Sequence, residues 1–180
     1  SVTNKLYCFG DNTFNQCSSE SVSLLKVPQM YHFLDKIDES VNIVKAECGK
    51  NFTCCLTQSG RFYGFGRNKA VLRSKHHRDD LMKNGVWYNT NRHVYRDFSV
   101  GLQHIVLITK FGDKIVSFGY AFDHDQFDSH LRVIGITDTV FEIDRDNFDG
   151  LHDNAQIHKV FAGMDDIIVI FKRHLAGTSK

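Results

Sequence analysis

The 180-residue chain has a single proline, no long apolar run and almost no net charge. Its apolar stretches fall short of the ~20 residues that a membrane-spanning helix needs, and its start, SVTNKLYCFG, lacks the regions of a secretory signal. The 22 Lys and Arg residues nearly balance the 21 Asp and Glu residues. This balance argues against a membrane surface or a dedicated nucleic-acid surface.

The chain also lacks paired-cysteine and catalytic motifs. Five cysteines make an odd number with no CxxC spacing, and most of them sit in apolar runs, where a thiol behaves as a small hydrophobe. This usage predicts an intracellular protein, cytoplasmic or nuclear, with an organelle not excluded. No GxSxG, HExxH or phosphate-binding glycine loop occurs. We therefore expect no enzyme activity and no cofactor.

What the chain does contain favours β-structure. Apolar residues make up 42% and charged residues 24%, as in a soluble chain that folds around a core. Fifteen Phe, six Tyr and thirteen Gly supply strand formers and residues that permit tight turns.

An internal repeat organises the sequence. Residues 41–68 align with residues 95–121 and partly with residues 156–172. A fixed self-similarity of this kind indicates a repeat fold. The recurring structural positions are Gly10, Asn12, Gly49, Gly60, Gly66, Asn68, Gly101, Gly112, Gly119 and Gly163.

One unit predicts three short strands. They cover Ile43–Glu47, Phe52–Thr57 and Phe62–Phe65, with Gly49 at the first turn and a hairpin at Gln58–Gly60. Glycine at these turns suits positive φ or a close backbone approach. The next copy has one more residue between its two glycines, Gly112 and Gly119, which predicts a β-bulge there.

The repeat resembles a known family. The runs LYCFGDNTFNQC, CGKNFTCCLTQSGRFYGFGRN and VGLQHIVLITKFGDKIVSFG are similar to repeats of the regulator of chromosome condensation family, whose units form four-stranded propeller blades. The resemblance implies an all-β chain, a partial β-propeller of about three four-stranded blades. The family usually has seven blades, and its Gly-Gln-Leu-Gly is replaced here by residues 15–18, Asn-Gln-Cys-Ser.

The expected organisation is one propeller segment over residues 1–174 with a short tail. The repeat cores lie near 1–17, 41–68, 95–121 and 156–172, the insertions are 69–94 and 122–155, and the tail is 175–180.

The first and last strands predict open blade edges. Leu6–Phe9 would be the last strand of a blade, whereas Ile157–Ala162 and Ile167–Phe171 would be the two inner strands of another. Exposed strand edges invite pairing. We expect another protein chain, a second copy or further residues of a longer propeller to cover them.

The first insertion carries the candidate partner-binding residues, which are basic or aromatic. They are Arg67, Lys69, Arg73, Lys75, Arg78, Trp87, Tyr88 and Arg92. Such residues can anchor an acidic protein surface or a nucleic-acid backbone. The alternative is a solvated loop, since surface loops are generally charged.

Two polar segments raise the alternative of a metal. They hold His124, Asp125, Asp128 and His130, and Asp144, Asp146 and Asp149. Neither follows a ligand motif: a calcium loop starting at Asp144 would need a carboxylate at position twelve, where Ala155 stands. We expect no metal, because polar loops usually carry such residues without ligating anything.

Three functions follow from these observations. We favour a non-enzymatic protein-interaction module or structural subunit that binds a partner through long inter-strand loops. The resemblance implies, as the alternative, nucleotide exchange on a small GTPase or regulation of one. A metal-dependent hydrolase built on the segment around His124 is the third.

Overall fold

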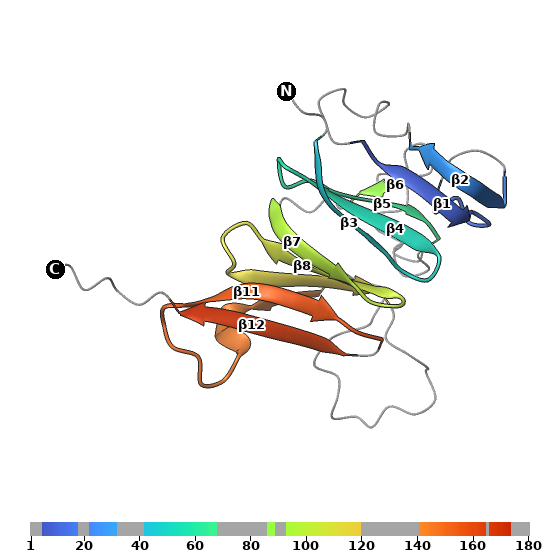
Figure 1. The fold of residues 1–180 in the computed structure, drawn as a ribbon. Coiled ribbons are helices and arrows are strands. Elements are labelled where there is room, and N and C mark those ends of the chain that lie inside the picture. The colour runs from blue at the N-terminus through green and yellow to red at the C-terminus, as the bar shows by residue number, and fades with distance from the viewer. Residues whose placement is uncertain are drawn as a thin grey trace, which may run out of the picture.

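The protein consists of four antiparallel sheets stacked in a row (Figure 1). The computed structural model describes residues 5–17, 22–31, 42–67, 86–88, 93–119, 141–164 and 166–173. Two sheets have four strands, in the orders β3-β4-β5-β6 and β10-β9-β8-β7, and two have two strands, β1-β2 and β11-β12. The two-stranded sheets lie at opposite ends of the row (Figure 1).

The strands are short, as glycine-punctuated apolar runs predict. Their bounds are β1 (Tyr7–Asp11), β2 (Leu24–Met30), β3 (Ile43–Cys48), β4 (Phe52–Thr57), β5 (Phe62–Gly66), β6 (Val86–Tyr88), β7 (Tyr95–Val100), β8 (His104–Thr109), β9 (Lys114–Gly119), β10 (Phe141–Asp144), β11 (Ala155–Ala162) and β12 (Ile167–Arg173), with one 3-10 turn, η2 (Arg145–Asn147).

Every described residue of β4 and β8 is buried, because each of these strands is covered on both faces by a neighbouring sheet. Successive side chains of a strand point to opposite faces. Cys54 therefore packs towards β7–β9, whereas Cys55 packs with Leu6 and Cys8 on the side of β1. The two thiols thus point to opposite faces of β4.

Three apolar interfaces hold the row together. The first joins the β1-β2 sheet to β3–β5, with the ring of Tyr31 stacked on Phe65 at 4.3 Å. The second joins β4 and β5 to β7–β9, where Phe62 and Phe98 meet edge to face at 5.2 Å. The third packs β8 and β9 against β11 and β12, with Ile157 fully buried.

The three strands predicted for one unit agree with β3, β4 and β5 to within one residue. Three other predictions need correction. The segments 69–94 and 122–155, predicted as insertions, contain β6 and β10, which complete the two four-stranded sheets. The strand predicted as the last of its blade is followed by β2, with which it pairs.

The predicted bulge between Gly112 and Gly119 is wrong. The β8-β9 register runs without a shift from His104↔Gly119 to Ile108↔Ile115. The extra residue lies in the turn, where Thr109 Oγ1 donates to Asp113 Oδ1 at 2.5 Å. Register shifts occur instead in the first strand of each unit, for example between Ile43 and Lys45.

Candidate interaction surface

Three turns with the same geometry lie side by side at one end of the sheets. They follow β3, β7 and β11, and we call this end of the molecule the turn face. In each turn the glycine N–H donates to the carbonyl three residues on: Gly49 to Phe52 at 2.8 Å, Gly101 to His104 at 2.9 Å, and Gly163 to Asp166 at 2.9 Å.

A side chain at these glycines would collide with its neighbour. A Cβ at Gly49 would meet the ring of Phe52, and a Cβ at Gly163 would meet the carboxylate of Asp166. A Cβ at Gly101 would meet the His104 ring and approach the carbonyl of Gly163. In each turn the side chain three residues on, and at Gly101 the next turn as well, leaves no room for a Cβ, which explains why glycine recurs here.

The three turns enclose an open groove of about 390 Å³. Each turn contributes three consecutive residues to it, namely Cys48, Gly49 and Lys50, then Val100, Gly101 and Leu102, then Ala162, Gly163 and Met164. The described part of the lining is mainly apolar and includes the side chain of Lys50. A backbone hydrogen bond joins the first two turns, in which the Lys50 N–H donates to the Leu102 carbonyl at 3.0 Å.

A polar network on the inner strands holds the turns in register. Lys45 Nζ donates to Asp97 Oδ1 at 2.7 Å and to the Phe98 carbonyl, and it lies 3.0 Å from Glu47 Oε1. Burial acts to lower the pKa of Lys45, but the hydrogen bonds to Asp97 and Glu47 outweigh it and hold that pKa above its ordinary value. The network therefore keeps Lys45 charged.

A repeated contact links each inner strand to the next. Glu47, two residues before its turn glycine, accepts from the Val100 N–H at 2.7 Å. Ser99 stands at the same point of the next unit and accepts from the Ala162 N–H at 3.0 Å. Sequence reasoning missed these contacts, although Lys45 and Asp97 each stand four residues before a turn glycine.

The predicted basic set lies only partly within the described residues. Arg67 directly follows β5 on the turn face, where its guanidinium carbon is 5.3 Å from the centre of the Phe14 ring. Trp87 and Tyr88 belong to β6, with Trp87 opposite Gly64. The other members, Lys69, Arg73, Lys75, Arg78 and Arg92, lie outside the described residues, as does Asn68.

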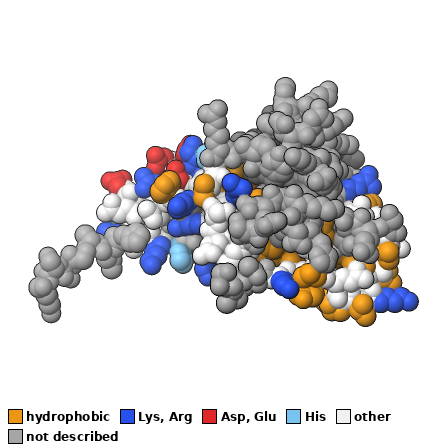
Figure 2. Space-filling view, turned by 90° about the horizontal axis from the view of Figure 1, so that it is seen from above, with side chains coloured by type: hydrophobic (Ala, Val, Ile, Leu, Met, Phe, Trp, Pro, Cys, Tyr) orange, Lys and Arg blue, Asp and Glu red, His pale blue; other side chains and the backbone are white. Residues whose placement is uncertain are grey.

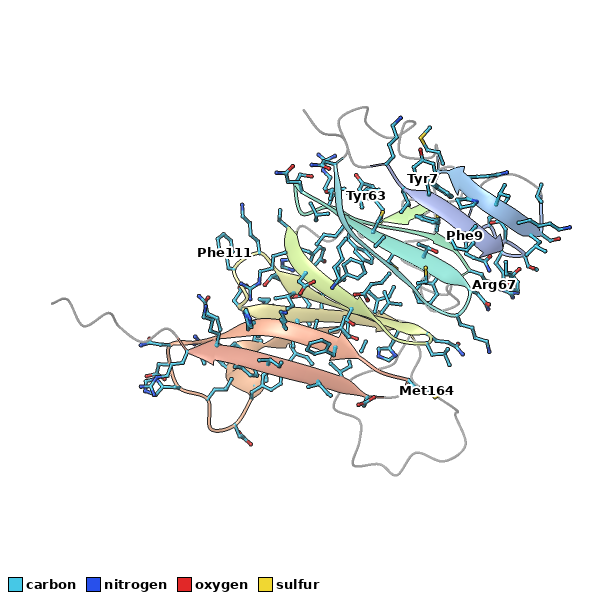
Figure 3. The ribbon with its side chains drawn as sticks, in the orientation of Figure 1. Tyr7, Phe9, Tyr63, Arg67, Phe111 and Met164 are labelled. Atoms are coloured by element: carbon cyan, nitrogen blue, oxygen red, sulfur yellow. The ribbon has the colours of Figure 1, made fainter. Side chains whose placement is uncertain are left out.

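Strands β5 and β9 both end on the turn face. Gly66 at the end of β5 pairs with Phe52, and Gly119 at the end of β9 pairs with His104, so both strands end on the turn face. Figure 3 shows Arg67 and Met164 towards this end of the strands and Phe111 towards the other.

The Gly-Asp-Asn motif of the first copy has a structural role. Asn12 is buried, its Nδ2 donates to the Val22 carbonyl at 2.8 Å, and its Oδ1 accepts from the Cys17 N–H at 2.9 Å. Gln16 Oε1 accepts from the Phe14 N–H at 2.8 Å, and its carbonyl accepts from Thr53 Oγ1 at 2.8 Å. These contacts join residues 12–17 to Val22 and dock them on β4.

The cysteines provide no activated nucleophile. Burial, with smaller contributions from neighbouring thiols, raises the pKa of Cys8 and of Cys55 to about 12. The pKa of the fully buried Cys54 is also raised, chiefly by burial. A thiol acts as a nucleophile when ionised, so the raised pKa values make these three less reactive at neutral pH than an exposed thiol.

The described ranges hold no group of three or more His, Cys, Asp or Glu side chains placed to bind a metal ion. Asp144 instead lies 3.2 Å from Lys114 Nζ, and Asp146 lies 3.0 Å from an Arg145 guanidinium nitrogen. The segment from His124 to His130 falls outside the described residues. In the same part of the chain, no helix has the length and apolar character required to cross a bilayer.

Comparison with solved structures defines the class of protein. The chain superposes on Prp20p of Saccharomyces cerevisiae, the yeast RCC1, with a TM-score of 0.69 and 20% identity over 96% of this chain and 41% of that one. Human WBSCR16 gives a TM-score of 0.68 with 11% identity, over 95% of this chain and 42% of the other. The stacked sheets are therefore blades of a β-propeller.

Sequence comparison names the repeat. The profile of the regulator of chromosome condensation (RCC1) repeat matches residues 43–70. A Protein RCC2 homolog of Danio rerio is 37% identical over 65 residues, and one of Xenopus laevis is 34% identical over 68 residues. These matches cover 36% and 38% of the chain, and 12% of each relative. The chain thus carries an RCC1 repeat over residues 43–70, as the resemblance implied.

Proposed function

We propose that this chain is a non-enzymatic protein-interaction module that binds a partner protein through its turn face. The observation that carries the proposal is the open groove between three equivalent turns. Its walls are rigid, because each turn is fixed by the same backbone hydrogen bond and neighbouring turns are tied together. A rigid groove lets a partner bind without a large loss of conformational entropy.

The chemistry of the groove suits a protein side chain. Met164 stands 60% exposed at its rim, Leu102 lines its wall, and Lys50 can pair with a carboxylate. Exposed methionine adapts to the shape of a partner. Arg67 lies at the same end, so that a partner seated in the groove would also reach it.

Regulation of a small GTPase is the second candidate function. It is favoured by the propeller likeness to Prp20p, which was described together with its binding to Gsp1p and histones. A further structure shows Prp20p bound to Kap60. The chain spans about two fifths of Prp20p, so binding of any of these proteins is a proposal here. The five free thiols support a location inside the cell.

Binding measurements with purified Gsp1p, histones and Kap60 test both functions. We expect at least one of them to bind the wild-type chain, and Met164→Asp to weaken that binding tenfold or more, since it places a charge at the apolar rim. Phe111→Ser, at the opposite end of the blades, is the matched control and should bind as wild type. Equal binding by all three chains would contradict the assignment of the turn face.

Nucleotide release separates the two functions. If the chain regulates the GTPase, labelled GDP should leave Gsp1p faster when the chain is added, and Met164→Asp should slow that release. If the chain is only an interaction module, Gsp1p or another partner binds while the release rate stays that of the GTPase alone. If none of the three proteins binds, the proposal that this chain binds a partner of Prp20p is wrong.

A further inference from the structure

Two strands at opposite ends of the row have one edge with no partner among the described residues. β1 pairs only with β2, and β12 pairs only with β11. In the complete blades, the third strand also pairs with the second strand, as β5 does with β4 and β9 with β8. The repeat alignment makes β1 a third strand and β12 a second strand.

The β1 edge carries two aromatic side chains that are buried at the same point of the next blade. Tyr7 and Phe9 correspond to Tyr63 and Phe65, because in both strands the tyrosine stands two residues before the phenylalanine of a Phe-Gly pair. Tyr63 and Phe65 are 4% and 0% exposed because β1 and β2 cover them, whereas Tyr7 and Phe9 are 57% and 67% exposed. Figure 3 shows both on β1 at the end of the row.

The β12 edge shows the reciprocal pattern. Ile168 and Ile170 lie five and seven residues after Gly163, as Val106 and Ile108 lie after Gly101. Val106 and Ile108 are fully buried against β11 and β12. Ile168 and Ile170 are 56% and 42% exposed. Each end of the row therefore presents the apolar face that the other end would cover.

We propose that β12 of one copy of this chain pairs antiparallel with β1 of a second copy and forms a composite blade of order β11-β12-β1-β2. The complete blades supply the register. Thr53 pairs with Phe65 and Cys55 with Tyr63. Transferred along the repeat, the register sets Ile167 opposite Phe9 and Ile168 opposite Cys8.

This register buries both exposed faces in one step. Residues directly opposite in an antiparallel pair share a face of the sheet. Phe9 therefore joins Ile167, which already packs on β8 and β9 of its own copy, and Ile168 joins Cys8, which packs on β4 and β5 of the other. Hydrophobic side chains are gathered at the end of the molecule that carries β1 and β2 (Figure 2).

A second copy is the occupant that this chain itself supplies. Among the described residues, the β1-β2 sheet holds the two outer strands of a blade and the β11-β12 sheet holds the two inner ones, so that a second copy supplies the half that each sheet needs. The contact is head to tail, which closes into a ring when the rotation permits. Two copies closed in this way hold six blades, within the range of about 4–8 blades that propellers adopt.

Native mass measurement of the 180-residue chain tests the assembly. We expect an oligomer, with the closed dimer at twice the 20.7 kDa of one chain as the main species. Phe9→Ser should convert it to monomer, because Phe9 is buried only in the composite blade. Phe111→Ser removes another exposed aromatic, 75% exposed on the β8-β9 turn, and should leave the mass unchanged. A wild-type monomer would overturn the proposal.

A cysteine cross-link tests the register. Opposite residues have Cα atoms about 4.5–5.5 Å apart, which a disulfide spans. Ile168→Cys should form a disulfide-linked dimer with native Cys8 under a mild oxidant, and the added change Cys8→Ser should abolish it. Ile167→Cys, on the other face, should not cross-link to Cys8. A dimer that cross-links equally at both positions, or at neither, would overturn the composite blade.

Discussion

At the scale of single residues, Asn12 is the side chain on which the first loop most depends. It is buried and bonds to the backbone on both sides of the loop. We expect Asn12→Ala to lower the free energy of unfolding by about 1–3 kcal/mol, because two part-buried hydrogen bonds to the backbone are lost. Urea unfolding measures this. The exposed Asn154→Ala is the control, expected within about 0.5 kcal/mol of wild type. Equal stability of the two variants would contradict the role of Asn12.

The cysteines give a second prediction at this scale. Cys48 is exposed at the groove, whereas burial raises the pKa values of Cys54 and Cys55 and shields both thiols. We expect iodoacetamide at neutral pH to alkylate Cys48 readily, and to reach Cys54 and Cys55 only after unfolding. Peptide mass mapping at increasing times distinguishes the sites, with Cys48→Ser as the control. Labelling of Cys54 at the rate of Cys48 would show that the β4 interface is open.

Single residues also show what sequence reasoning could reach. Gly60 and Gly112 adopt positive φ, as the hairpin turns predict. Gly49 was placed correctly at a turn, but what excludes a side chain there is the ring of Phe52 folded over it. That contact depends on a rotamer and on a neighbouring strand, and spacing alone does not reveal it.

At the scale of elements, the ion pair of Lys45 and Asp97 joins β3 to β7. It links two different blades, at 2.7 Å, with both side chains about one third exposed. In a double-mutant cycle with Lys45→Ala and Asp97→Ala, we expect a coupling energy of up to about 1 kcal/mol, the range of partly exposed pairs. The pair Lys114 and Asp144, on β9 and β10 within one blade, is the comparison. A coupling energy of zero would show that this ion pair does not stabilise the contact between β3 and β7.

The pH dependence of that coupling follows from the raised pKa of Lys45. In the unfolded chain Lys45 titrates near its ordinary value of 10.5, and in the folded chain above it. The stabilisation is therefore fully present below pH 10.5 and is lost as the pH rises through the folded pKa. Repeating the cycle on both sides of that value should show the loss only on the alkaline side. A fall in the coupling energy between neutral pH and pH 9 would contradict the raised pKa of Lys45.

Element prediction succeeded where the apolar pattern is strong. The strands over Ile43–Cys48, Phe52–Thr57 and Phe62–Gly66 match those expected to within one residue. β6 and β10 were missed because they have only three and four residues and join the sheet by backbone pairing at its edge. The extra residue of the second hairpin could be counted from sequence, but its place in the turn depends on the bond between Thr109 and Asp113.

At the scale of the whole molecule, the repeat predicted blades but not how they meet. Stacking requires both faces of β4 and β8 to be buried, which their continuous apolar runs indicate. The groove arises only when three turns come together, and no single unit contains it. The candidate site could therefore be predicted as a set of glycines, and not as a cavity.

The propeller fold requires the sheets to stack in a fixed order, which methyl NMR measures directly. Nuclear Overhauser contacts should connect Leu107 to Leu56 across the second interface, and Ile108 to Ile157 across the third. Leu56 and Ile157 should show none, because the β7–β10 blade separates them (Figure 1). Backbone contacts that place β4 and β8 as paired neighbours in one sheet would contradict the propeller.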